Sequence, residues 1–224
     1  MESRFFMSYK YTMIVFRIIF IISIVCLSFF GPYKAFINSN PTTDKNYIDV
    51  YEGSSMYAVL DKLKLSSLIN KLFFKIYLHI NSIKSFQAGE YDIKNKDFEE
   101  IIDLLIKGKT HTHSLTIIEG MNIYDIEKQL ENSFLINDCS LLVCIKTNYP
   151  FKEGVLYPDT YFYKKGMKAS DLLNKSHKKL DDFLNLTWMK KPDNDILENK
   201  YQALVLASII EKEAGNHSEK PDIA

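Results

Sequence analysis

Residues 48–63 read IDVYEGSSMYAVLDKL and residues 115–130 read LTIIEGMNIYDIEKQL, and these two similar stretches give the clearest indication of the fold. Each begins with a β-rich segment, continues through Glu-Gly to a Tyr four residues after the Gly, and closes on Leu. After the Gly, apolar residues recur at helical spacing in both copies. The pattern predicts two units of strand, Gly turn and helix, although two amphipathic units can also reach this similarity by chance.

The segment between the copies predicts further elements. We expect an apolar helix near Ser66 to His79, a strand at Gly89 to Ile93, and a helix at Phe98 to Lys107 that Gly108 ends. Strands and helices that mix without regular βαβ alternation indicate the α+β class. Residues 46–131 form a short β-α-α-β part, a pattern that resembles the LysM-like modules that bind cell-wall glycan.

The N-terminal region predicts a membrane helix. Residues 11–30 read YTMIVFRIIFIISIVCLSFF, about the length that an α-helix needs to cross a bilayer core of about 30 Å. Arg17 can extend its side chain toward the headgroups. The basic residues Arg4 and Lys10 predict that residues 1–10 stay in the cytoplasm and that everything after Phe30 is exported. A cleaved signal peptide is the alternative, but no small-x-small pattern closes the apolar run.

Composition limits the remaining possibilities. The chain has 224 residues, 46% of them hydrophobic and 25% charged, which suits one large domain or two small ones. Its formal net charge is zero, which disfavours binding to nucleic acid. Residues 31–45 are rich in Asn, Ser, Thr and Pro, so we expect a linker there and a fold that begins near Asn46.

The cysteines and histidines give weaker signals. Cys26 lies in the apolar run, and we expect Cys139 and Cys144 to be buried thiols rather than a bridge. Three cysteines are too few for a disulfide-built scaffold and leave the redox compartment undecided. His111 and His113 face the same way on a strand, but no Cys or acidic cluster lies nearby at ligand spacing, so we expect no metal site.

Residues 153–163, EGVLYPDTYFY, are rich in aromatic side chains. Aromatic rings beside Pro, Asp and Thr suit a sugar-binding groove, because flat rings cover sugar faces while polar groups bind hydroxyls. The alternative is a hydrophobic hairpin stabilised by a turn at the Pro. A helix from Ala169 to about Phe183 follows.

The last predicted helix runs from about Asn199 to Ala214 and reads NKYQALVLASIIEKEA. It is apolar almost all round from residue 204 to residue 210, which predicts burial in a domain core. Glu211 and Glu213 lie at its C-terminal end, where the helix dipole and aliphatic neighbours favour the protonated carboxyl that a general acid needs. The alternative is an ordinary solvated Glu-Lys-Glu helix end.

Two of these motifs carry a family resemblance. EGVLYPDTY (153–161) and LASIIEKE (206–213), in that order behind an N-terminal anchor, resemble the YceG-like endolytic murein transglycosylases. AGEY (88–91) and EGM (119–121) are similar to earlier landmarks of that family. The resemblance implies a single-pass protein of the bacterial inner (cytoplasmic) membrane, with a catalytic domain at residues 132–224 outside the cytoplasm. In the family this domain continues into Asn-Arg-Leu and Gln-Thr-Asp-Pro-Thr motifs, so the resemblance implies that it is incomplete here at its C-terminus.

The resemblance also implies a reaction. Such enzymes cleave MurNAc-β-1,4-GlcNAc bonds within glycan strands, form 1,6-anhydroMurNAc without a cofactor, and so terminate strand elongation. The family's catalytic role falls on Glu213. The residues expected to bind substrate are Glu153, Tyr157, Asp159, Thr160, Tyr161, Ser208 and Glu211. Expected partners are glycan strands, the membrane and peptidoglycan synthases, and the alternative is a non-catalytic, membrane-anchored wall-binding or division-scaffold protein.

Overall fold

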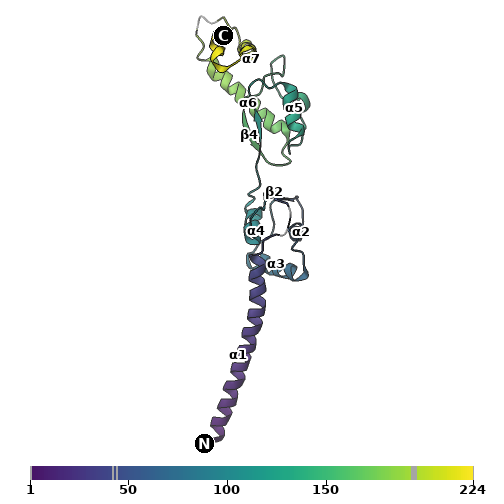
Figure 1. Ribbon diagram of the computed structural model, residues 1–224, viewed down its shortest axis with the longest axis vertical. Coiled ribbons are helices and arrows are strands. Elements are labelled where there is room, and N and C mark those ends of the chain that lie inside the picture. The colour runs from purple at the N-terminus through teal and green to yellow at the C-terminus, as the bar shows by residue number, and fades with distance from the viewer. Residues whose placement is uncertain (1, 42, 44, 193–195, 224) are drawn as a thin grey trace. The chain divides into compact units, whose positions relative to one another are not determined.

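The computed structural model describes residues 2–41, 43, 45–192 and 196–223 (Figure 1). Helices and small antiparallel sheets mix along the chain, as the sequence predicts. The chain divides into two compact units, residues 1–110 and residues 111–224. The sequence interpretation placed this division after Glu131. It falls earlier because residues 113–117 pair with a strand of the second unit, a partnership that local sequence does not reveal.

The first unit begins with α1 (Glu2–Ile37), which contains a stretch, Met13–Ile37, long and apolar enough to cross a membrane. The helix continues beyond the predicted end at residue 30. Phe36 is buried, with its ring centroid 4.5 Å from that of Phe98, and the Ser39 carbonyl accepts a hydrogen bond from the Phe98 amide. This part of the expected linker at 31–45 therefore belongs to the fold, because an aromatic contact outweighs its polar composition. Residues 42 and 44 of that linker lie outside the described residues.

The rest of the first unit confirms the predicted β-α-α-β order. Its elements are β1 (Tyr47–Val50), α2 (Tyr57–Lys62), α3 (Leu68–Ile80), β2 (Gly89–Asp92) and α4 (Phe98–Lys107). β1 and β2 pair antiparallel, with Tyr47 opposite Asp92. α4 matches its prediction because its ends are encoded locally: Asp97 and Glu100 form a capping box, and Gly108 adopts the left-handed conformation at the C-cap. Phe74 and Tyr91 are fully buried in the core.

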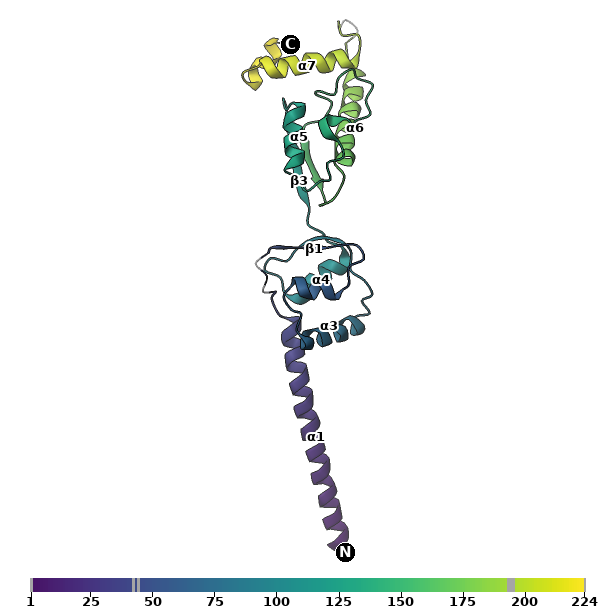
Figure 2. The ribbon, with the colours of Figure 1, turned by 90° about the vertical axis from the view of Figure 1, so that its right-hand side faces the viewer.

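The second unit holds another short sheet (Figure 2). Its elements are β3 (His113–Ile117), α5 (Ile123–Glu131), the 3-10 helix η1 (Ser140–Leu142), β4 (Asp159–Tyr163), α6 (Ala169–Trp188), α7 (Lys200–Glu213), η2 (His217–Glu219) and α8 (Lys220–Ile223). β3 and β4 pair antiparallel, so residues 159–163 form one strand of this sheet and not a local hairpin. The two predicted Gly turns share their backbone shape, since Gly53 and Gly120 have φ of +76° and +74°.

The expectation of a buried terminal helix was wrong. α7 forms at its predicted position and is capped by the Asn199 side chain, but it has no buried residue. Val205 and Ile209 are 38% and 51% exposed. Three of its apolar residues, Leu204, Ala207 and Ile209, line an open cleft instead of filling a core, as described below.

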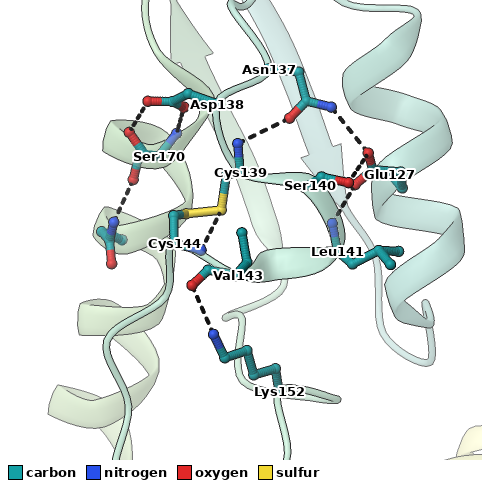
Figure 3. The surroundings of a disulfide bond; sticks show 11 residues. Glu127, Asn137, Asp138, Cys139, Ser140, Leu141, Val143, Cys144, Lys152 and Ser170 are labelled. Atoms are coloured by element: carbon teal, nitrogen blue, oxygen red, sulfur yellow. Dashed lines mark hydrogen bonds between the residues drawn. A yellow bond between two sulfur atoms is a disulfide. The ribbon is translucent and has the colours of Figure 1, made fainter.

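The expectation for the cysteine pair was also wrong. Cys139 and Cys144 form a disulfide around η1 (Figure 3). Within this turn Leu141 and Leu142 have positive φ values of 46° and 57°. This backbone brings the two sulfur atoms together, and composition alone gives no sign of it.

Candidate functional site

A cleft of about 480 Å³ lies within the second unit, between α7 and the rest of that unit. One wall is the end of β3 with the turn into α5, and a second is the loop that precedes β4. α7 supplies the third wall through Leu204, Ala207, Ser208, Ile209, Glu211, Lys212 and Glu213. The lining is mostly aliphatic with a few polar groups, which is the usual character of a ligand site.

The two glutamates of α7 differ in their surroundings. Glu211 is half-buried, and its carboxylate forms an ion pair with Lys220 at 2.6 Å. Glu213 is the last residue of α7, lines the cleft and is exposed. The sequence predicted apolar surroundings for both carboxylates. In the structure neither carboxylate has a wholly apolar environment, because Glu211 is ion-paired and Glu213 is exposed to solvent.

Several contacts hold α7 over the cleft. Near its C-terminal end, the Lys212 Nζ donates a hydrogen bond of 2.6 Å to the Gly120 carbonyl in the turn between β3 and α5. Near its N-terminal end, the Tyr201 ring stacks on the Tyr149 ring with centroids 5.5 Å apart. The Tyr149 hydroxyl donates to Asp181 of α6 at 3.1 Å. Sequence analysis missed these positioning contacts, because they join segments far apart in the chain and no local pattern reports them.

The loop wall is fixed by two charged side chains. Glu153 accepts a hydrogen bond of 3.1 Å from the amide of Ile123, the first residue of α5, where an anion is favoured by the helix dipole. The Lys152 ammonium donates to the Val143 carbonyl at 2.8 Å (Figure 3). Val143 lies inside the disulfide-closed turn, and Leu142 of that turn also lines the cleft. The disulfide thus supports one side of the cleft.

The predicted site residues fall into two groups. The cleft lining includes Glu153, Ser208, Glu211 and Glu213. Within this group, the Ser208 hydroxyl donates to the Val205 carbonyl at 2.7 Å, a bond inside α7 itself.

The other four predicted residues lie on or beside β4 and do not belong to this lining; they are Tyr157, Asp159, Thr160 and Tyr161. Tyr161 is buried, which raises the pKa of its hydroxyl, and this hydroxyl donates to the Tyr157 carbonyl at 2.7 Å. Asp159 forms an ion pair with Lys179, which holds the pKa of the Asp159 carboxyl below its ordinary value. Thr160 bonds Thr116 across the sheet, with the hydroxyl oxygens 3.0 Å apart.

No metal site emerges among the residues that the structure describes, where no group of three or more His, Cys, Asp or Glu could hold an ion. The His111 and His113 rings lie 4.7 Å apart in an edge-to-face contact, and the His113 ring also stacks on Tyr163.

Comparison with known proteins identifies one family that this chain matches. A family model described as the YceG-like family matches residues 48–224. Among solved structures, the chain is similar to a crystal structure of a yceG-like protein from Listeria monocytogenes, with 21% identity and a TM-score of 0.35. That match covers 79% of this chain and 67% of the Listeria chain. No curated protein matches the sequence.

Proposed function

The chain belongs to the YceG-like family, and from this premise we propose that it is a membrane-anchored lytic transglycosylase that cleaves peptidoglycan glycan strands internally. The observation that carries this proposal is the cleft whose α7 wall ends in two glutamates. One suitably placed carboxylic acid is enough for the lytic reaction, and α7 offers two candidates for it.

We assign the acid and base role to Glu213. As an acid, Glu213 gives its proton to the glycosidic oxygen while the bond from that oxygen to C1 of MurNAc breaks. The resulting carboxylate then accepts the proton of the C6 hydroxyl as O6 bonds to C1, which closes the 1,6-anhydro ring and restores the acid. Hydrolytic glycosidases usually need a second carboxylate, because they activate water or form a covalent intermediate.

The surroundings of the two glutamates support this assignment. The Glu211 carboxylate is already engaged by the ion pair with Lys220, which leaves it less free to approach a leaving group. Glu213 lies one residue beyond Lys212, whose bond to the Gly120 carbonyl fixes the end of α7 against the opposite wall of the cleft. Glu211 and the loop residue Glu153 are then candidates to bind sugar hydroxyls.

We further propose that α1 anchors the protein in the cytoplasmic membrane, with the part of the first unit that follows α1 and the whole second unit on the outer side. The length and apolar character of Met13–Ile37 support the anchor, and the basic residues Arg4 and Lys10 support this orientation. The Cys139–Cys144 disulfide is consistent with export, because disulfides persist mainly in oxidising compartments outside the cytoplasm.

The first unit suggests a second activity in the same protein. Its β-α-α-β order, with β1 and β2 paired antiparallel, supports a LysM-like role in binding glycan. A protein that only binds the cell wall, or serves as a division scaffold, would use this unit without any chemistry in the cleft. Binding without cleavage is therefore the alternative function.

The deciding assay incubates the full chain, purified in detergent, with isolated glycan strands and measures fragments that end in 1,6-anhydroMurNAc by mass spectrometry. We expect Glu213→Gln to lower the cleavage rate by at least ~10²–10⁴-fold, the usual contribution of general acid–base catalysis. Glu211→Gln is the matched comparison and should cost far less cleavage activity than Glu213→Gln. Thermal melting of both variants shows whether a loss is chemical or structural. Strand binding without cleavage by the wild-type chain would favour the alternative, and a dead Glu211→Gln variant would refute the assignment to Glu213.

A further inference from the structure

Helix α3 has two apolar faces, and the fold buries only one of them. Phe73, Phe74, Tyr77 and Leu78 face the core of the first unit. On the other side, exposed side chains are Leu68, Ile69, Leu72 and Ile80, at 87%, 63%, 53% and 66% exposure. Leu68, Leu72 and Ile80 are spaced by multiples of four residues and form one row along the helix. A cluster of large exposed aliphatic side chains on one short helix marks an interaction surface.

Aromatic contacts fix α3 against the end of α1. The Phe73 ring centroid lies 5.6 Å from that of Phe29, 5.7 Å from that of Tyr33 and 6.0 Å from that of Phe36. These three partners lie in the last part of the apolar stretch Met13–Ile37. In both ribbon views α3 runs across the axis of α1, on the side of the first unit from which α1 leaves (Figures 1 and 2). A bilayer that surrounds α1 would therefore end close to α3.

The charges of α3 suit the surface of a membrane. Lys71, Lys75 and His79 are spaced by four residues and form a strip beside the exposed aliphatic row, and residues 68–80 contain no Asp or Glu. Helices that lie in a bilayer surface combine an apolar face with a basic flank, because the apolar side chains enter the acyl boundary while the cations meet anionic headgroups. The lysine stems are long enough to keep their ammonium groups at headgroup level.

We infer that α3 lies in the lipid surface next to α1, with Leu68, Leu72 and Ile80 immersed in the acyl boundary. This inference rests on the proposed membrane anchoring of α1. The first unit is then attached to the membrane by two elements, a spanning helix and a surface helix joined through Phe73. Such an attachment fixes the tilt of the first unit, because tilting this unit away from the bilayer surface would pull the aliphatic row of α3 out of the lipid.

The test uses tryptophan fluorescence of the full chain. In a Trp188→Phe background, which removes the only native tryptophan, single tryptophans are introduced by Leu72→Trp, Ile22→Trp and Tyr51→Trp. Ile22 lies within the apolar stretch of α1, and Tyr51 is an exposed residue that directly follows β1. Each variant is reconstituted in vesicles of phosphatidylethanolamine and phosphatidylglycerol, with or without lipids brominated on their acyl chains. We expect blue-shifted emission and quenching by brominated lipid for Ile22→Trp and Leu72→Trp, and neither effect for Tyr51→Trp.

The outcomes separate the inference from the proposal beneath it. If Ile22→Trp is quenched while Leu72→Trp emits like Tyr51→Trp, α1 is in the membrane but the inference about α3 is wrong. If Leu72→Trp is blue-shifted without quenching, a protein surface covers this face and the inference is again wrong. If Ile22→Trp escapes quenching, the anchoring proposal itself fails. Leu68→Trp, at the most exposed position of the row, is a second probe that must agree with Leu72→Trp.

Discussion

Loss of the disulfide should destabilise the second unit measurably. The perturbation is the double variant Cys139→Ala/Cys144→Ala, which removes the covalent closure of the turn around η1. This turn holds Leu142, which is buried and lines the cleft, in a left-handed conformation that an L residue rarely adopts. Without the bridge, the unfolded chain regains freedom that the folded turn must then give up.

The magnitude follows from the size of the closed loop. The two cysteines are separated by five positions, and the chain-entropy relation for so short a loop gives about 2 kcal/mol at 25 °C. For a unit of this size that free energy corresponds to a drop in melting temperature of roughly 8 °C. The turn also anchors Lys152 through the Val143 carbonyl, so glycan cleavage should fall together with stability.

Trp188 provides the assay, because it is the only tryptophan and lies at the end of α6 in the second unit. Melting is followed by its fluorescence for the wild type and the double variant, each with and without a phosphine reductant. We expect the reductant to lower the wild-type melting temperature to that of the variant and to leave the variant unchanged. Cys26→Ala, which removes the free exposed cysteine, is the control. Equal melting temperatures for the oxidised and the reduced wild-type protein would refute the reasoning.

Three further changes test separate contacts. Lys212→Met removes the bond to the Gly120 carbonyl, and we expect glycan cleavage to fall by up to ~10²-fold at an unchanged melting temperature, since small displacements of a catalytic group are costly. The Ser170 amide and hydroxyl hold the pKa of Asp138 below its ordinary value, so Asp138 stabilises the fold above that ordinary value and the benefit is lost as pH falls through the lowered one. Asp138→Ala should therefore lower the melting temperature at pH 7 but have little effect near pH 2, which a pH series of melts would show. Phe74→Ala should cost the first unit about 3–5 kcal/mol, visible by circular dichroism, and leave the Trp188 transition in place.

The elements that the sequence predicted well have their signals nearby in the chain. The ends of α4 follow from Asp97, Glu100 and Gly108, all within or next to the helix. The Gly turn of each repeat likewise needs only its own glycine. By contrast, the division between the units depends on the pairing of β3 with β4, and the exposure of α7 depends on what packs beside it. Contacts between segments far apart in the chain cannot be predicted from the periodicity of the sequence.

The prediction for the site was limited by the geometry of a strand. The composition of the aromatic motif predicts one groove, but successive residues of a strand point to opposite faces of the sheet. Tyr161 and Tyr163 of β4 accordingly face the core, while Thr160 and Phe162 are exposed on the other side. No flat cleft can receive all of these side chains at once. A motif of consecutive residues therefore identifies a family more reliably than it identifies the residues of one surface.

The Glu-Lys-Glu end of α7 shows the same limit on a helix. Consecutive helical residues point about 100° apart, so these three side chains cannot share one environment. Glu211 reaches Lys220 of α8, Lys212 reaches the Gly120 carbonyl, and Glu213 remains at the exposed end of the cleft wall. Spacing alone gave both glutamates an apolar face and could not choose between them. Our proposal of Glu213 is supported by the different contacts of the two residues before it, because Glu211 is engaged by Lys220 while Lys212 fixes the helix end from which Glu213 extends.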